Sequence, residues 1–231
     1  MGTFQEQIRI SVVIPALNAA ETLPQTLASL SEATSIEEVI VVDGGSSDET
    51  SLIARASGAR VIAARRGRGS QLAAGAAIAS AEWLFFLHAD CRLEPSWEAA
   101  VGGFLSAPDA TGRAGYFDLA LDDTTPAARR LERIVAWRCR VLALPYGDQG
   151  LLVARQLYEA IGGFAPLPLM EDVDFVRRLG RRRLARIGGR CIASSRRYRH
   201  EGYWCRALRN LYCLCLYYAG ISPDRILRIY G

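Results

Sequence analysis

Lysine is absent from the sequence, and arginine supplies all 28 of its basic residues. Arginine carries a rigid fork of hydrogen-bond donors that suits phosphate groups. The arginines gather in three stretches, at residues 65–68, 177–186 and 190–199. Aromatic residues are not interleaved with them as base stacking would require, so nucleic acid is not an expected partner. A phosphate-bearing ligand or an anionic membrane surface fits these clusters better.

Paired cysteines and long apolar runs are missing too. The six cysteines form neither a CxxC pair nor a dense disulfide framework, which indicates free thiols in a reducing compartment. No apolar run follows a basic stretch at the N-terminus, and no segment reaches the ~18 apolar residues of a membrane span. We therefore expect a soluble, cytoplasmic protein.

The first half of the chain alternates short apolar runs with helical patterns. Uninterrupted β-branched or aromatic runs predict strands at residues 10–15, 38–42, 60–63 and 83–87. Helical spacing and capping residues predict the intervening helices at residues 20–30, 48–57 and 69–80. This order is typical of right-handed βαβ units on a parallel sheet, whose ligands bind beyond the carboxyl ends of the strands.

The second half of the chain is less regular. Its patterns predict strands at residues 115–121, 150–153 and 184–193, and helices at residues 126–143, 172–180 and 202–219. There is no internal repeat, low-complexity linker or clean break in composition. The sequence therefore predicts a single α/β domain over residues 1–231.

Acidic residues in three loops are candidates for chemistry. Asp43 and Asp90 each follow a predicted strand. The carboxylate of Asp90 can bind a divalent cation that bridges two phosphates, and the glycines after Asp43 let a ligand approach the backbone closely. Glu171 and Asp172 open a predicted helix. Each position also has a structural explanation: Asp90 can cap a following helix, Asp43 can begin a tight turn, and acids at a helix start compensate the helix dipole.

Considered together, these loops resemble family 2 of the glycosyltransferases, and more narrowly a bacterial subgroup of small, stand-alone members. The motifs that carry the resemblance, in order, are IPALN (14–18), DGGSSDET (43–50), RGRGSQLAAGA (66–76), FLHADC (86–91), GDQGLLV (147–153), GGF…PLMEDVDF (162–175) and SSRRY (194–198). The resemblance runs from about residue 9 to residue 231. It implies an inverting enzyme with the GT-A fold, a Rossmann-like mixed, mainly parallel sheet flanked by helices. Residues of about 9–110 would bind the nucleotide sugar, and residues of about 111–231 would form the acceptor side.

The resemblance implies roles on the donor side of the site. Pro15 and Asn18 would line the nucleotide pocket, and Asp43 would hydrogen-bond the base or the ribose. Arg68 would face the nucleotide or its diphosphate. Asp90 would bind a divalent cation, manganese or magnesium. The base of the donor stays open between UDP and GDP.

Other roles belong to the acceptor side. Asp172 matches the position of the catalytic base, with Glu171 as its neighbour in the pair. Asp148 and Gln149 would lie in the acceptor-side loop. The diphosphate would be steadied as it leaves by one of two arginines, Arg196 and Arg197.

His88 departs from the pattern of the wider family, because it stands where the first aspartate of an Asp-x-Asp motif is usual. Imidazole is a poorer ligand than carboxylate for magnesium, though manganese accepts it. We expect His88 to hydrogen-bond the ribose or a phosphate, with metal binding as the alternative.

These expectations imply a mechanism, which has to be weighed against other functions for the chain. The acceptor hydroxyl would lose its proton to a carboxylate and attack the anomeric carbon opposite the diphosphate, whose charge the metal and arginines stabilise. A nucleotide-sugar-binding pseudoenzyme or sensor is the alternative, and the substitution at His88 supports it. A nucleotidyltransferase usually has an early lysine, which is absent here. A dehydrogenase would need GxGxxG after the first strand.

The C-terminal helical pattern raises the question of membrane contact. Trp204, Leu208, Leu211 and Cys215 recur on one helical stripe. An exposed stripe would suit a membrane interface and a lipid acceptor, whereas a buried stripe would suit a small acceptor. Because an exposed apolar stripe invites aggregation, we predict that the stripe is mostly buried and the acceptor is not a lipid.

Overall fold

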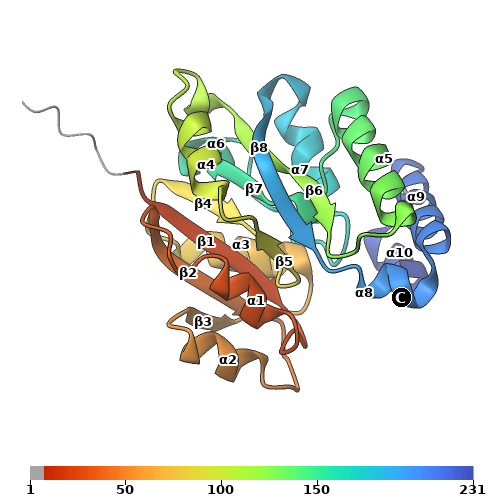
Figure 1. Ribbon diagram of the computed structural model, residues 1–231, viewed down its shortest axis with the longest axis horizontal. Helices are drawn as coiled ribbons and strands as arrows, with labels where there is room; N and C mark the ends of the chain where they lie inside the picture. Colours follow the sequence, from red (N-terminus) through yellow and green to blue (C-terminus); the bar gives the residue numbers. More distant parts are fainter. Residues whose placement is uncertain (1–7, 231) are drawn as a thin grey trace, which may run out of the picture.

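The structure is a computed structural model that describes residues 8–230. Its strands form one eight-stranded sheet in the order β3-β2-β1-β4-β7-β6-β8-β5 (Figure 1). The strands are β1 (Ile10–Ala16), β2 (Ile36–Asp43), β3 (Arg60–Ala63), β4 (Trp83–Phe86), β5 (Cys91–Leu93), β6 (Ala114–Leu121), β7 (Leu151–Ala154) and β8 (Leu184–Ala193).

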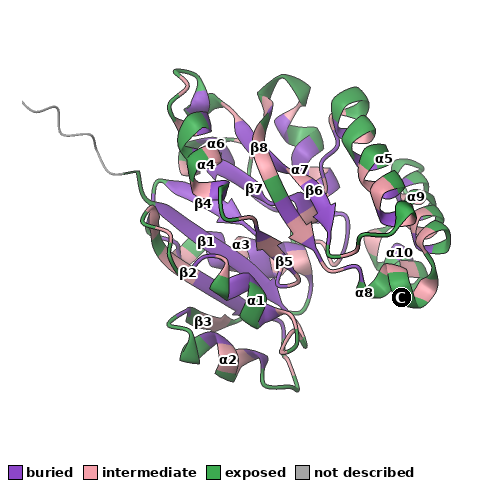
Figure 2. Ribbon diagram, in the orientation of Figure 1, coloured by how far each residue is buried: buried purple, intermediate pink, exposed green. Residues whose placement is uncertain are grey.

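Ten α-helices accompany the sheet within the described residues. They are α1 (Leu23–Ala28), α2 (Thr50–Ala56), α3 (Arg68–Ile78), α4 (Trp97–Leu105), α5 (Pro126–Leu142), α6 (Arg155–Ala160), α7 (Glu171–Leu179), α8 (Arg196–Glu201), α9 (Tyr203–Tyr218) and α10 (Pro223–Tyr230). In Figure 1, α1 lies in front of the sheet and α3 behind it. Helices therefore flank both faces, and the interior strands are buried, as Figure 2 shows.

The first half of the sheet is parallel. Strand β1 pairs in parallel with both β2 and β4, and β2 pairs in parallel with β3. The β-branched run of β1 is buried at every position because helices cover both faces. The carboxyl ends of β1, β2 and β4 therefore meet at one edge.

Helix α3 packs unusually closely on this half. A Cβ at Gly75 would come within 2.3 Å of Val13 Cγ1 and 2.9 Å of Val42 Cγ2. Nearer the start of α3, Gln71 Nε2 donates to the carbonyl oxygens of Ala16 and Val42, each at 2.8 Å. The helix thereby ties the ends of β1 and β2 together below the loops that follow them.

The second half of the sheet is mixed. Strand β7 runs antiparallel to β4 and to β6, whereas β6 and β8 are parallel. The expected mixed, mainly parallel sheet flanked by helices is confirmed. The idea that Asp90 caps a following helix is wrong: strand β5 follows Asp90 directly and pairs with β8 from Cys91↔Ala193 onward.

The expected burial of the C-terminal stripe is also wrong. The side of α9 that carries Trp204, Leu208 and Leu211 is exposed, at 55%, 63% and 54% of the respective residue surfaces. Cys215, on the same stripe, is exposed as well. Instead, α9 buries a neighbouring side that includes Arg206, Cys213 and Leu214. Helix α9 thus exposes apolar residues to solvent and buries a charged one. Arg206 points inward, where it donates to Glu201 and to the Tyr230 carbonyl oxygen.

Within the described part of the chain, no helix is both long enough and apolar enough to cross a membrane.

Candidate functional site

The loop after β4 carries two of the candidate residues to the edge of the sheet. The amide of Leu87 donates to Val13 O at 3.1 Å, which keeps the chain beside β1. The amide of Cys91 then donates to His88 O at 3.1 Å and closes a tight turn. His88 and Asp90 are half-buried in this turn. They lie where ligands of a parallel sheet are expected.

A cleft opens at this edge, with about 820 Å³ of space that is partly open to solvent. Six of the predicted site residues line it: they are Arg68, His88, Asp90, Asp148, Asp172 and Arg197. The first and the last of these residues, Arg68 and Arg197, are more than a hundred residues apart in the chain. The fold therefore assembles basic, acidic and imidazole side chains around one space.

Gly147 lies against residues from two sides of this cleft, Asp172 and His88. Its amide donates to Asp172 Oδ2 at 2.7 Å. A Cβ at this position would lie 2.4 Å from His88 Nε2, so only glycine lets the imidazole sit against the backbone. The second oxygen, Asp172 Oδ1, accepts from the Val173 amide at 2.7 Å. The aspartate is thereby oriented at the start of α7, next to the histidine loop.

The two neighbouring carboxyl groups at the start of α7 have different surroundings. Glu171 is 1% exposed, and neither of its side-chain oxygens has a hydrogen-bond partner. Burial, followed by the charge of Asp172, raises the pKa of Glu171 to about 8. Glu171 is therefore protonated at neutral pH, whereas Asp172 faces the cleft.

Arg68 is held at the cleft by two glycines. Gly67 has a φ of +134°, and a Cβ at Gly69 would lie 2.1 Å from Ala165 O. The Gly69 amide donates to Leu167 O at 3.0 Å, so the RGRG turn passes tightly along the segment before α7. Burial opposes the positive charge, but the acidic groups around Arg68, including Asp90 and Asp172, raise its pKa above the ordinary value. The arginine is a permanent cation facing the cleft.

Three potential metal ligands lie close together in the loop after β4. Ligand atoms of His88, Asp90 and Cys91 all lie within 4.8 Å of one another. Burial and the charge of Arg68 lower the pKa of His88 to about 4, so the imidazole is neutral at pH 7. A hydrogen bond with Cys191, together with burial, raises the pKa of Cys91, which therefore stays a thiol. His88 and Asp90 fit a divalent cation, while a protonated thiol does not.

Asp148 lies in the short 3₁₀ turn Gly147–Gln149 and lines the cleft. Its Oδ1 is buried without a hydrogen-bond partner. Burial, partly offset by Arg138, raises its pKa to about 6. An unpartnered buried carboxylate oxygen is costly unless a ligand or ion satisfies it, so this group suits the lining of a binding site.

Gln149 does not lie in the cleft. Its side chain is 1% exposed, its Nε2 donates to Phe117 O at 2.9 Å, and its Oε1 accepts from Arg138 and from the Tyr146 amide. All of its polar atoms are thus engaged within the protein. Gln149 therefore supports the loop that carries Asp148.

Pro15, Asn18 and Asp43 lie beside the cleft but are not among its lining residues. Pro15 is buried in β1, and Asn18 is exposed with its Oδ1 accepting from the Ser47 amide at 2.8 Å. Asp43 accepts from Ser46 and Ser51 hydroxyls at 2.6 and 2.7 Å. Although burial opposes it, these bonds lower the pKa of Asp43. The three residues shape the loops after β1 and β2.

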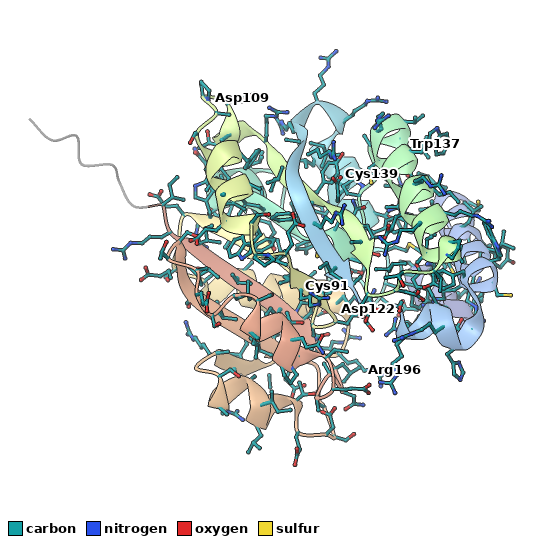
Figure 3. All side chains as sticks on the ribbon, viewed as in Figure 1. Cys91, Asp109, Asp122, Trp137, Cys139 and Arg196 are labelled. Atoms are coloured by element: carbon teal, nitrogen blue, oxygen red, sulfur yellow. The ribbon has the colours of Figure 1, made fainter. Side chains whose placement is uncertain are left out.

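The two candidate arginines of α8 separate. Arg197 lines the cleft, whereas Arg196 is exposed and forms an ion pair with Glu21 (Figure 3). Further lining residues, to which the sequence analysis assigned no role in the site, include Tyr146, Tyr198, Arg206, Asn210 and Tyr230. Four of these five come from the C-terminal helices, whose inward faces have no local sequence signature.

Comparison with known families agrees with this geometry. The family model described as glycosyl transferase family 2 matches residues 11–167, which include β1, the loop after β4 and the turn with Asp148. The matched stretch ends before Asp172.

Individual relatives match shorter stretches. Glucosyl-3-phosphoglycerate synthase of Mycobacterium tuberculosis is 37% identical over 92 residues, which are 35% of this chain and 28% of the relative. A PGL/p-HBAD biosynthesis glycosyltransferase of the same species is 38% identical over 104 residues, 41% of each chain. The matched segments thus span less than half of the length of these curated relatives.

Solved structures give a wider match. The same synthase, crystallised with Mn²⁺, UDP and glucosyl-3-phosphoglycerate, is similar with a TM-score of 0.58 and 28% identity, covering 79% of this chain and 70% of that chain. A crystal of the synthase with Mg²⁺ and UDP gives a TM-score of 0.58 at 27% identity, with 79% and 70% covered.

Proposed function

Because the chain belongs to glycosyl transferase family 2, we propose that it transfers a sugar from a nucleoside-diphosphate sugar to an acceptor, with inversion at the anomeric carbon. The observation that carries the proposal is the cleft itself, in which Arg68, His88, Asp90, Asp172 and Arg197 come together at the carboxyl edge of the parallel strands. The similar synthase structures hold UDP with Mn²⁺ or Mg²⁺. A UDP-sugar is therefore the leading donor, ahead of a GDP-sugar.

The donor diphosphate would lie between the loop after β4 and the start of α3. Asp90 and His88 would hold a divalent cation, which when bound neutralises phosphate charge and stabilises the leaving group. Arg68 and Arg197 contribute fixed positive charge on the walls of the same cleft. His88 is neutral at pH 7, so its imidazole is free either to bind the cation or to hydrogen-bond the ribose or a phosphate.

Asp172 would take the proton of the acceptor hydroxyl. Its carboxylate lines the cleft and is oriented by the amides of Gly147 and Val173. A base held by two backbone donors keeps its position while the hydroxyl attacks the sugar. Asp148, with its unpartnered oxygen, would bind the acceptor or the donor sugar. The loops with Asn18 and Asp43 would adjoin the base and ribose, where Pro15 supports them.

Free cysteines agree with a reducing location. All six are unpaired, and four of them are buried. We propose that the protein acts in the cytoplasm, where nucleotide sugars and reduced thiols coexist.

A panel of UDP-, GDP- and dTDP-sugars, tested by thermal shift with and without manganese, examines the proposal. A donor at ~100 times its dissociation constant should stabilise the fold by roughly 2.7 kcal/mol. We expect a shift with UDP-sugars that grows when manganese is added. The absence of any metal-dependent shift across the whole panel would contradict the proposal.

A further inference from the structure

The outward face of α9 carries no charged residue. Its exposed positions follow one stripe along the helix and are Trp204, Cys205, Leu208, Leu211, Tyr212, Cys215 and Tyr218. The three largest aliphatic and indole side chains among them are more than half exposed. A surface helix normally presents polar residues to water, so an entirely uncharged outer face indicates contact with something apolar.

Helix α5, which packs against α9, has an exposed apolar stripe of its own. Ile134, Trp137 and Val141 are exposed at 46%, 57% and 42%. Figure 3 shows Trp137 on the outer side of α5 and Cys139 on the side that faces the sheet. The two helices pack against each other at the same end of the molecule (Figure 1). We refer to the exposed residues of α5 and α9 together as the α5–α9 surface.

The exposed charges of the α5–α9 surface are all positive. On α5 they are Arg130, Arg133 and Arg140. The single acid of α5, Glu132, points away from solvent: it accepts from the Leu121 amide at 2.7 Å and pairs with Arg129. Helix α9 contains no acid at all. The α5–α9 surface therefore combines tryptophan, tyrosine and aliphatic side chains with arginines at its border. Such a composition favours the headgroup region of an anionic bilayer.

We propose that the α5–α9 surface docks on the surface of an anionic lipid bilayer. The apolar stripes would enter the headgroup and upper acyl region, while the α5 arginines would contact lipid phosphates. The docking does not rest on the proposed sugar transfer. It has a consequence for the cleft, however, because another side of α9 lines it through Arg206 and Asn210. A docked molecule holds the cleft close to the membrane surface.

A second copy of the chain fits this surface less well than a bilayer does. In a two-fold contact the same patch meets itself, so the α5 arginines of both copies would enter one interface. No exposed acid on either helix is available to pair with them. Like charges in one interface are unfavourable, whereas anionic headgroups are complementary to them.

Co-sedimentation with vesicles tests the docking. We expect the full chain to pellet with phosphatidylcholine vesicles that contain about 30% phosphatidylglycerol, and the pelleted fraction to fall as salt is raised. Binding to pure phosphatidylcholine vesicles should be at least about tenfold weaker. The variant with Trp204→Ala and Leu208→Ala should lose about tenfold or more in vesicle affinity. Both side chains are exposed, so the fold should be kept.

Matched controls come from α2. Leu52 is 67% exposed and Arg55 is exposed on the same helix. We expect Leu52→Ala to bind vesicles like the unchanged protein. We also expect the variant with Arg133→Glu and Arg140→Glu to bind anionic vesicles at least about tenfold more weakly, while Arg55→Glu has a much smaller effect.

Three outcomes would overturn the docking. The first is failure of the unchanged protein to pellet with anionic vesicles. The second is an equal loss in the α2 and α9 variants, which would mean that binding is not specific to this surface. The third is a dimer in analytical ultracentrifugation that Leu208→Ala dissociates, without vesicle binding, which would assign the surface to a second copy of the chain.

Discussion

The two adjacent carboxyl groups at the start of α7, Glu171 and Asp172, have different surroundings. Glu171 is buried without partners and is neutral at pH 7, because burial and Asp172 raise its pKa to about 8. Asp172 lines the cleft and accepts from two amides. Two carboxyl groups whose environments differ in this way can serve as a structural acid and a proton acceptor. The structure therefore favours Asp172 over Glu171 as the base.

Replacement of Asp172 tests this assignment. Asp172→Asn should lower turnover by ~100- to 10,000-fold, because a general base is lost, while donor affinity barely changes. Release of nucleoside diphosphate from the donor gives the rate, and calorimetry gives the affinity. Glu171→Gln is the matched control, since it replaces a neutral acid with a neutral amide and should keep most of the activity. Greater damage from Glu171→Gln would reverse the assignment, and full activity of Asp172→Asn would exclude Asp172 as the base.

Glu171 also makes stability depend on pH. Its folded pKa of about 8 lies above the value of 4.5 for an unperturbed group, so the folded state holds a proton that the unfolded state has lost between these values. Stability from this group is full below about pH 4.5 and falls by up to about 1.4 kcal/mol per pH unit as pH rises toward 8.

Chemical denaturation of the Glu171→Gln variant checks this expectation. The variant should gain free energy of unfolding relative to the unchanged protein as pH rises from 6 toward 8, since glutamine does not ionise. Glu159→Gln on the exposed face of α6 serves as the control and should show no such trend. A constant difference across pH would mean that Glu171 is ionised in the folded protein.

At the residue scale, the sequence predicted the cleft in part. The cleft brings together Arg68, His88, Asp90 and Asp172, as predicted from the motifs. Each of these residues lies in a sequence motif at a loop or at the start of a helix. Gln149 lies in the same loop as Asp148, as expected, but its side chain is buried and hydrogen-bonds the backbone, a role that the sequence does not distinguish from ligand binding. The sequence did not predict that Tyr230 lines the cleft, because the position of Tyr230 depends on how the last helices pack. The local sequence carries no signal for that packing.

The fit of α3 on the parallel strands is the closest contact between elements in the first half of the fold. Gly75→Ala would force a methyl group toward Val13 and Val42. We expect a loss of about 1–3 kcal/mol in the free energy of unfolding, as for other overpacked cores. Gly102→Ala on α4 is the matched control, because no atom lies within 4 Å of its added Cβ.

The control should be neutral or stabilising by roughly 0.5–1 kcal/mol, since alanine favours the helix over glycine. Urea denaturation of both variants makes the comparison. Equal stability of the two variants would contradict close packing at Gly75.

Elements whose pattern is local were predicted well, and those set by tertiary pairing were not. Strand β3 covers residues 60–63 as expected, because its apolar run is bounded by turn residues. Strand β5 was missed: it has three residues, and its pairing with β8 decides its conformation. The outward face of α9 was misjudged because periodicity identifies a stripe without showing which side faces the core.

On the scale of the whole molecule, the site lies where two differently built halves meet. The parallel strands β1, β2 and β4 bring the loop of His88 and Asp90 to one edge. The antiparallel strand β7 joins the second half to β4 and carries the turn with Asp148 directly before it. Helices α7 and α8 then close the cleft with Asp172 and Arg197. Both halves of the chain therefore contribute residues to the cleft.

Loss of Asp90 should remove the metal dependence of donor binding and leave the fold intact. Calorimetry of Asp90→Ala with the best donor of the panel should show weaker binding that no longer responds to manganese. Asp109→Ala is the control, at an exposed position far from the cleft (Figure 3). Unchanged affinity and metal dependence in Asp90→Ala would remove Asp90 from the proposed metal site.

The most direct test of a metal-assisted nucleotide-sugar site is the anomalous scattering of manganese in crystals grown with UDP or GDP. The structure leads us to expect one strong peak in the cleft, in contact with the Asp90 carboxylate and the diphosphate, with Arg68 facing the same phosphates. The peak should be missing from crystals of Asp90→Ala. A nucleotide bound outside this cleft, or bound within it with no manganese beside Asp90, would contradict the account.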